Sequence, residues 1–231
     1  MDIEYTTLEN CSTATGTVVV IDVWRSFTTA PFAFAAGARD IVTVGSAEEA
    51  LALRGRFPDA LLMGMGELDG PPAKGFDLGN SPTALMARDL RGRRIVQCTP
   101  NGTKGIVRSA KAKTLLASSF VCAGATVRYI KRRLPARVTF VSTGQDGEDQ
   151  ACAEYMAALL CDETRDVATL LGHIRDTGQQ GFRSFVSRGI WTEETRAALE
   201  ADLDCCLALD RFDFAMLVQR RDGLLVMEAV S

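Results

Sequence analysis

Short, wholly apolar runs alternate along the chain with longer runs of helical periodicity. Apolar runs of strand length begin near residues 17, 40, 60, 93, 114 and 137, and a helix-like segment follows each of them. Apolar runs without polar alternation are typical of strands buried on both faces of a sheet. The pattern predicts an α/β fold with three α/β/α layers, a mainly parallel or mixed sheet, and helices on both faces.

The last third of the chain has a different pattern. Residues 161–210 are helical in periodicity, and Thr192 is placed to cap a helix. Two apolar runs then flank an Asp222-Gly223 turn, which predicts a C-terminal hairpin at the edge of the sheet. No linker divides the chain, so we expect a single α/β domain over residues 1–231, with two closely packed subdomains as the alternative.

Composition restricts the class of partner. The chain has 231 residues, of which 47% are hydrophobic and 24% charged, and its formal net charge is −3. It therefore has no overall basic field for a nucleic acid or an anionic membrane, and a small molecule is the expected partner. No apolar run is long enough to span a bilayer, and the first ten residues are acidic and polar rather than a signal peptide, so we expect a cytoplasmic protein.

Cysteine and histidine usage excludes several kinds of chemistry. Seven cysteines occur without C-x-x-C spacing, which is typical of reduced thiols. His173 is the only histidine, so a zinc site or a Ser-His-Asp triad lacks the ligands it needs. No G-x-x-x-x-G-K-[ST] run is present, which argues against a P-loop nucleotide-binding protein.

Charged and amide side chains follow the ends of several predicted strands. In chain order these residues are Asp22, Arg25, Glu67, Asn101, Asp146, Glu148 and Asp149. The carboxyl ends of parallel strands meet at one edge of a sheet, where open α/β proteins bind their ligands. The sequence therefore predicts a crevice lined with carboxylates.

Carboxylates without histidine or cysteine favour a hard cation such as Mg²⁺, which takes one or two carboxylates, water and phosphate oxygens. Arg25, Lys74, Asn101 and Lys104, with the glycine-rich helix starts at "NGTKG" and "TGQDGED", provide groups for an anion. Together they indicate Mg²⁺-dependent phosphate chemistry. The alternative for each acid taken alone is a helix cap or a solvated loop residue.

Four segments carry a resemblance to a known family. The segments "IDVWRSFTTAPFAFAAGA", "KGFDLGNSPTAL", "PNGTKGI" and "GEDQACAEYM", within residues 18–160, resemble the 2-phosphosulfolactate phosphatase family. The resemblance implies an α/β/α, Mg²⁺-dependent phosphoric monoester hydrolase. Such an enzyme would hydrolyse the phosphate ester of 2-phospho-3-sulfolactate to sulfolactate and inorganic phosphate, in coenzyme M biosynthesis.

We assign roles to the matching positions as a hypothesis. The expected catalytic residues are Asp22, Arg25, Glu67 and Asp149, and the expected magnesium ligands are Asp22, Glu67, Asp77, Glu148 and Asp149. The expected substrate-binding residues are Arg25, Lys74, Asn80, Ser81, Asn101, Gly102 and Thr103. Attack by a metal-bound water and attack by Asp22 itself both stay open.

Three departures from the family pattern keep other functions open. Leu68 follows Glu67 where an arginine is usual, Pro100 replaces a threonine, and Trp24 replaces a smaller residue. The alternatives are a descendant that acts on another small phosphorylated acid, or a non-catalytic anion-binding protein. An enzyme of the haloacid-dehalogenase type is disfavoured because Asp22-Val23-Trp24 lacks a second acid. A homodimer is the expected assembly if the chain is not a monomer.

Overall fold

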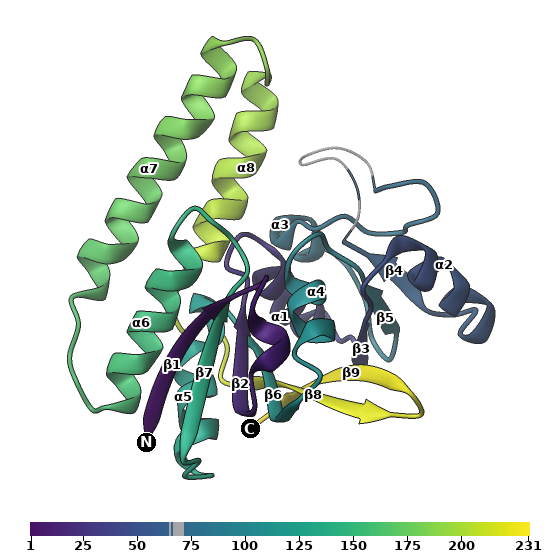
Figure 1. The fold of residues 1–231 in the computed structure, drawn as a ribbon. Coiled ribbons are helices and arrows are strands. Elements are labelled where there is room, and N and C mark those ends of the chain that lie inside the picture. The colour runs from purple at the N-terminus through teal and green to yellow at the C-terminus, as the bar shows by residue number, and fades with distance from the viewer. Residues whose placement is uncertain (65, 67–71) are drawn as a thin grey trace.

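A nine-stranded sheet forms the centre of this computed structural model, which describes residues 1–64, 66 and 72–231 (Figure 1). The strands are β1 (Asp2–Thr7), β2 (Gly16–Ile21), β3 (Asp40–Thr43), β4 (Leu61–Met63), β5 (Arg94–Gln97), β6 (Ala112–Ser118), β7 (Arg137–Ser142), β8 (Ala215–Arg221) and β9 (Leu224–Val230). The α-helices are α1 (Ser26–Ala35), α2 (Ala47–Arg56), α3 (Pro82–Leu85), α4 (Gly102–Arg108), α5 (Ala123–Lys131), α6 (Glu148–Leu160), α7 (Val167–Ser187) and α8 (Glu193–Cys206), and two short 3₁₀ helices, η1 (Cys11–Thr13) and η2 (Phe120–Cys122), accompany them.

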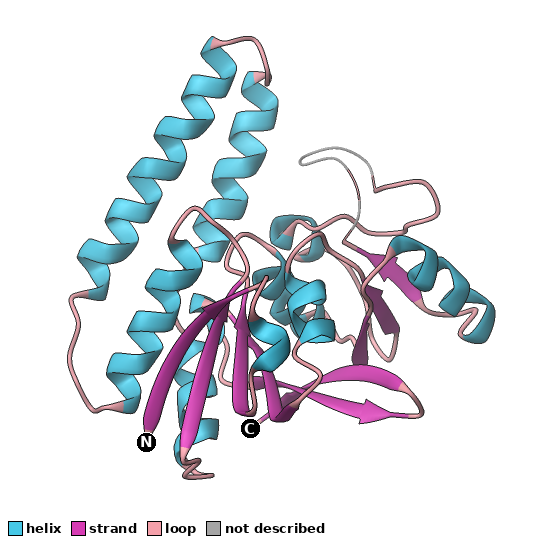
Figure 2. Ribbon diagram, in the orientation of Figure 1, coloured by secondary structure: helices cyan, strands magenta, loops and turns pink. Residues whose placement is uncertain are grey.

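The sheet is mixed, and its order is β1-β7-β2-β6-β8-β9-β3-β5-β4. The four strands β1, β7, β2 and β6 are mutually parallel, as are β3, β5 and β4. Between these groups lies the hairpin β8–β9, which pairs in antiparallel fashion on both of its sides. The α/β class and the helices on both faces are as predicted (Figure 2).

The hairpin corrects one prediction, because it lies in the middle of the sheet and not at its edge. Its apolar side chains explain this position. Met216 and Met227 are fully buried in one core cluster, while Ala215 belongs to the cluster on the opposite face. A hairpin that is apolar on both faces is stable between two strands, whereas an edge strand needs a polar side.

The hairpin also affects which strand ends can meet. Between β6 and β3 the sheet contains three antiparallel pairings in succession. The strands β3, β5 and β4 therefore run in the opposite direction to β2. A twist of about 20–25° per strand adds up to about 100–125° over the five steps from β2 to β5. The end of β5 is thereby turned toward the end of β2, and the Ser26 and Thr99 hydroxyls there are 2.9 Å apart.

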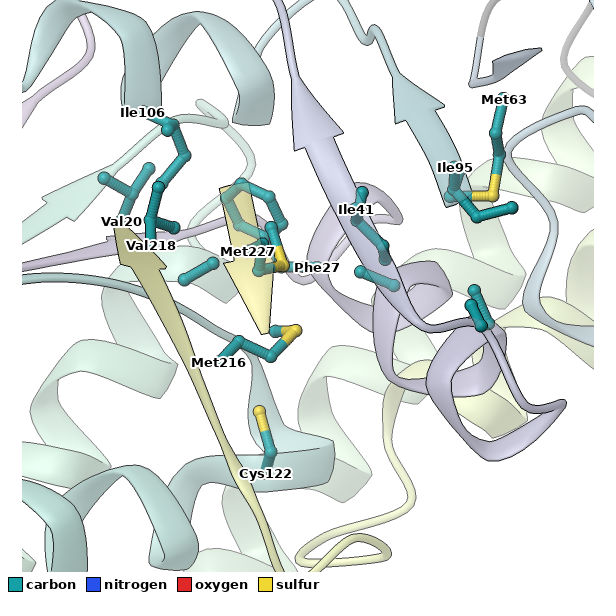
Figure 3. Close-up of a cluster of buried hydrophobic side chains, with 14 of the residues drawn as sticks. Val20, Phe27, Ile41, Met63, Ile95, Ile106, Cys122, Met216, Val218 and Met227 are labelled. Atoms are coloured by element: carbon teal, nitrogen blue, oxygen red, sulfur yellow. The ribbon is translucent and has the colours of Figure 1, made fainter. Parts of the chain in front are cut away.

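Alternation along the strands places the core on both faces of the sheet. In β2, Val18 and Val20 belong to a cluster with α1 and α4, whereas Val19 and Ile21 belong to a cluster with α5, α6 and α8. Figure 3 shows the first cluster extending from Val20 across the hairpin toward β5. A third cluster packs α2 on β3, β4 and β5. The layers are therefore helix, sheet and helix, as predicted.

Two segments lie at the periphery. Strand β1 was not predicted, because its polar sequence reflects an edge strand that pairs only with β7. Helices α7 and α8 form a pair that extends from the body (Figure 1), and α7 has no buried residue. Within the described part of the chain, no helix is both long and apolar enough to cross a membrane. The single-domain assignment stays a prediction.

Candidate functional site

The carboxylate of Asp22 lies just beyond β2 and is 5% exposed. Its oxygens accept hydrogen bonds from the Ser26 backbone N–H (2.9 Å) and the Ser26 hydroxyl (2.7 Å). Asp22 therefore holds Ser26, the first residue of α1, from a position three residues before the N-cap residue Arg25. The strand is apolar up to Ile21 because it is buried on both faces, and the charge appears where the sheet ends.

The glycine at the start of α4 contacts Asp22 directly. A Cβ at Gly102 would lie 2.7 Å from the Asp22 carboxylate and 2.8 Å from the Ser26 Cβ. The Gly102 backbone N–H also donates to Asp22. Only glycine allows the segment after β5 to lie this close to the segment after β2.

The carboxylate of Asp149 completes the group from the first turn of α6 and is 2% exposed. Its Oδ1 accepts the Val23 backbone N–H at 2.7 Å. Its Oδ2 accepts the backbone N–H groups of Thr143 (2.8 Å) and Gly144 (2.7 Å). Asp149 thus connects the loop after β2 to the loop after β7, the strand that is paired with β2.

The two buried carboxylates perturb each other. Burial raises the pKa of Asp22, against the hydrogen bonds from Ser26. Burial and the charge of Asp22 raise the pKa of Asp149 to about 7, against the backbone donors Val23 and Gly144. Burial also raises the pKa of Glu148, with the charges of Asp146 and Asp22 acting in the same direction. The group Asp22, Glu148 and Asp149 would therefore favour a proton or a cation near neutral pH.

Arg25, the predicted phosphate clamp, lies in a buried ion pair. It is 5% exposed, and its guanidinium donates to Asp202 Oδ2 on α8 at 2.5 Å. Asp202 Oδ1 also accepts from the Ser81 hydroxyl (2.8 Å), the Thr83 hydroxyl (2.6 Å) and the Thr83 backbone N–H (3.2 Å). This Arg25–Asp202 network joins α8 to the loop after β2 and to the start of α3.

Asp202 is not among the residues predicted from the sequence, although the chain carries a signal for it. The apolar face of α8 includes Leu199, Leu203 and Cys206, all buried, and Asp202 lies on that face by helical spacing. An acid on an apolar helix face indicates a buried partner. Nothing in the local pattern says that this partner is Arg25, 177 residues away.

The other predicted residues lie in several places. Ser81 caps α3 and belongs to the Arg25–Asp202 network. Thr103 is fully buried, and its hydroxyl and backbone N–H bond to Thr99. Asp77 accepts from Arg54 (2.6 Å) and from the Leu62 backbone N–H (2.8 Å) beside β4.

Four more residues complete the predicted set. Asn101 and Lys74 are exposed, and Asn80 is half-buried with no hydrogen-bond partner for its side-chain oxygen among the described residues. Glu67 lies outside the described residues. Among the predicted magnesium ligands that the structure describes, Asp22, Glu148 and Asp149 are close enough for their charges to interact, and Asp77 makes its contacts with Arg54 and β4. The roles of all these residues stay predictions.

The donor chemistry of the group suits magnesium. Within the described residues, no three acidic, thiol or imidazole groups converge as ready-made metal ligands. Magnesium does not require such a cluster, because it keeps several waters and takes one or two carboxylates. Buried carboxylates with raised pKa values would also be stabilised by a cation. Asp22 and Glu148 are the side chains that would hold it.

A cavity of about 650 Å³ lies beside Glu148, between α6, α7 and α8. Its wall is largely apolar and aromatic and includes Trp24, Phe182 and Phe185, with Glu148 at one side. The Trp24 ring packs on Phe182 with the ring centroids 5.6 Å apart. The space next to the carboxylates is therefore suited to an apolar group as well as to a charged one.

These features define an α/β protein with a buried acidic pair at the ends of two neighbouring parallel strands, a common position for an active site. The sequence pattern of one family, 2-phosphosulpholactate phosphatase, matches residues 4–221. The match covers most of the chain. The chain belongs to the 2-phosphosulpholactate phosphatase family.

Individual relatives agree with this assignment. A Bacillus subtilis protein is 35% identical over 145 residues (62% of this chain and 63% of the relative), and one from Carboxydothermus hydrogenoformans is 40% identical over 152 residues (64% and 62%). A Deinococcus radiodurans protein is 33% identical over 195 residues, 80% of each chain. Each is named "Probable 2-phosphosulfolactate phosphatase". The first two matches span less than two thirds of the relatives' own lengths.

Proposed function

We propose that this protein is a cytoplasmic, Mg²⁺-dependent phosphatase that hydrolyses the phosphate ester of 2-phospho-3-sulfolactate. The products would be sulfolactate and inorganic phosphate, in coenzyme M biosynthesis. The observation that carries the proposal is the buried pair Asp22 and Asp149 at the ends of β2 and β7, in a chain that belongs to this family. The relatives' printed names support the substrate.

The protein's own residues supply orientation and charge. Asp22 is aligned by two bonds from Ser26, and it would position an attacking water or attack phosphorus itself. Asp149 has a pKa of about 7, so its carboxyl group can hold or release a proton near neutral pH. Arg25 is oriented by Asp202, and its positive charge would attract the phosphate group of the substrate.

A bound magnesium ion would supply charge neutralisation at the phosphate oxygens and a more acidic water. Asp22 and Glu148 would hold that ion, with Glu67 as a further predicted ligand. Burial and the charge of Asp22 raise the pKa of Asp149, and a nearby cation would offset the second of these effects. Binding of the ion and ionisation of both acids are therefore expected to occur together.

The apolar cavity favours a second candidate function. Sulfolactate is small and carries two anionic groups, whereas the wall beside Glu148 is formed largely by Trp24, Phe182 and other apolar side chains. A phosphate ester with an apolar organic group would bury that group there. The second candidate is therefore hydrolysis of another small phosphate ester by the same carboxylates.

The test is release of inorganic phosphate from 2-phosphosulfolactate, phospholactate, glycerol phosphate and an aromatic phosphate ester, with Mg²⁺ and with EDTA. The expected result is chelator-sensitive release from the sulfonated ester. Asp22→Asn should lower kcat by about a hundredfold or more. The matched control is Asp213→Asn, an acid that is 90% exposed and pairs with Arg128.

The outcomes separate the candidates. Preference for the aromatic ester would support the second function and not the first. Release that is insensitive to EDTA, or equal activity in Asp22→Asn and Asp213→Asn, would contradict the metal–carboxylate site. No release from any ester, together with retained phosphate binding, would support a non-catalytic anion-binding protein.

A further inference from the structure

A second hollow, of about 480 Å³, lies on a different part of the surface from the carboxylate group. Its wall comes from the end of α2 and from the segments before β3 and β5. Four arginines line it: Arg39, Arg56, Arg93 and Arg94. We call this feature the arginine hollow.

Positive charge exceeds negative charge around the arginine hollow. Asp40 pairs with Arg94 (Nε to Oδ1, 2.7 Å) and with Arg39 (3.2 Å). Asp59 adds a second carboxylate to the wall. Asp222, in the β8–β9 turn, interacts electrostatically with Arg94. Within the described residues, Arg56 and Arg93 form no ion pair with a carboxylate, so their positive charges are not compensated in this way.

The arginines are held in place before any ligand binds. The Phe57 ring contacts the guanidinium of Arg94 at 4.5 Å and that of Arg56 at 5.1 Å from its centroid. The Arg93 Nε donates to the Asp59 carbonyl at 3.0 Å. Donors that are oriented in advance lose less conformational entropy on binding.

The backbone that carries these arginines is also fixed. The Arg39 N–H donates to the Arg93 carbonyl at 2.8 Å, and the Gly92 N–H donates to the Gly37 carbonyl at 3.0 Å. Gly37 has a φ of +100°, and a Cβ there would lie 2.7 Å from the Arg91 side chain. The two segments that carry Arg39, Arg93 and Arg94 are thus closely paired.

The arginine hollow is separate from the carboxylate group. Arg94 begins β5, and Thr99, which contacts Ser26 beside Asp22, lies beyond its other end. Five residues of extended chain span about 16 Å. A small ligand in the hollow would therefore not contact Asp22.

We propose that the arginine hollow binds a small anion with two or more phosphate-type groups. The planar fork of arginine matches two oxygens of such a group, and several guanidinium groups around one space favour a multivalent anion over a single charge. The volume lies within the range of about 300–1,000 Å³ typical of small-ligand sites. The proposal does not depend on the proposed phosphatase function.

The test is calorimetric titration of the full chain with inorganic pyrophosphate, and separately with inorganic phosphate, in EDTA. Wild type should bind one pyrophosphate saturably and phosphate more weakly. The double variant Arg56→Gln/Arg93→Gln should weaken pyrophosphate binding by about tenfold or more. Both positions are exposed, so the fold is expected to persist, and each single variant provides a second measurement.

Two matched controls separate the arginine hollow from other sources of binding. Arg91→Gln removes an exposed arginine that pairs with Asp89 outside the wall, and Asp22→Asn alters the carboxylate group; both should bind pyrophosphate as wild type does. Equal loss in Arg91→Gln and in the double variant would mean a diffuse field and overturn the proposal. Unchanged binding in the double variant, loss confined to Asp22→Asn, or no binding by wild type would overturn it as well.

Discussion

Replacement of Asp202 by asparagine should destabilise the protein and impair its site. The substitution keeps the shape of the side chain and removes the negative charge that faces Arg25 at 2.5 Å. Arg25 and Asp202 are 5% and 2% exposed, so water cannot replace the lost interaction. Removal of one partner of a buried pair costs about 3–5 kcal/mol of unfolding free energy.

The lower end of that range is expected here. The asparagine oxygen can still accept hydrogen bonds from Ser81 and Thr83, which contact Asp202 Oδ1. A loss of about 3 kcal/mol corresponds to a fall in Tm of about 6–12 °C for a chain of this size. The kcat/KM for phosphate release should fall by about tenfold or more, because Arg25 and the start of α3 lose their common support.

Asp204→Asn is the matched control. Asp204 lies two residues further along α8 and pairs with Arg175, with side chains 62% and 40% exposed. Exposed pairs contribute about 1 kcal/mol or less, so its Tm should fall by less than about 4 °C. Both variants are measured by thermal and urea unfolding with tryptophan fluorescence, whose signal comes from Trp24, beside Arg25, and from Trp191.

A double-mutant cycle completes the test. Arg25→Gln, Asp202→Asn and the double variant should show a coupling free energy of more than about 1 kcal/mol. Equal destabilisation by Asp202→Asn and Asp204→Asn, or a coupling near zero, would refute the reasoning. Normal kcat/KM in Asp202→Asn would show that the network has no part in positioning the site.

Three further predictions concern the same region. In EDTA, the unfolding free energy should rise as the pH falls from about 7 to 4, because Asp149 has a pKa of about 7 when folded and an ordinary value of 3.8. The full contribution of this shift to the unfolding free energy is about 4 kcal/mol. It should appear as the difference between wild type and Asp149→Asn in urea unfolding at each pH, and parallel curves for the two proteins would contradict it. Gly102→Ala should cost about 1–3 kcal/mol and most of the activity, because its Cβ would lie 2.7 Å from Asp22; wild-type Tm and turnover would show that the contact is absent. Ser81→Ala should lower the Tm through loss of the α3 cap and of the bond to Asp202, about 1–2 kcal/mol together, and an unchanged Tm would mean that the cap contributes nothing.

The sequence by itself determined the α/β class and the acids at the strand ends. A run such as Val18–Ile21 is apolar at every position because the residues on each face of β2 are buried, and this can be read locally. Asp22 was predicted because a charge directly after a buried strand lies at the edge of a sheet, and Asp149 because it follows the loop after another such strand. The hairpin around Gly223 was likewise predicted from turn chemistry.

Only the tertiary structure decided which of these elements meet. The hairpin β8–β9 lies at the centre of the sheet because both of its faces are apolar, and sheet twist then brings the end of β5 to Asp22. Arg25 is bound to Asp202, 177 residues away. Local periodicity reports whether a side chain is buried, but the identity of its partner depends on how distant elements pack, and no local pattern encodes that.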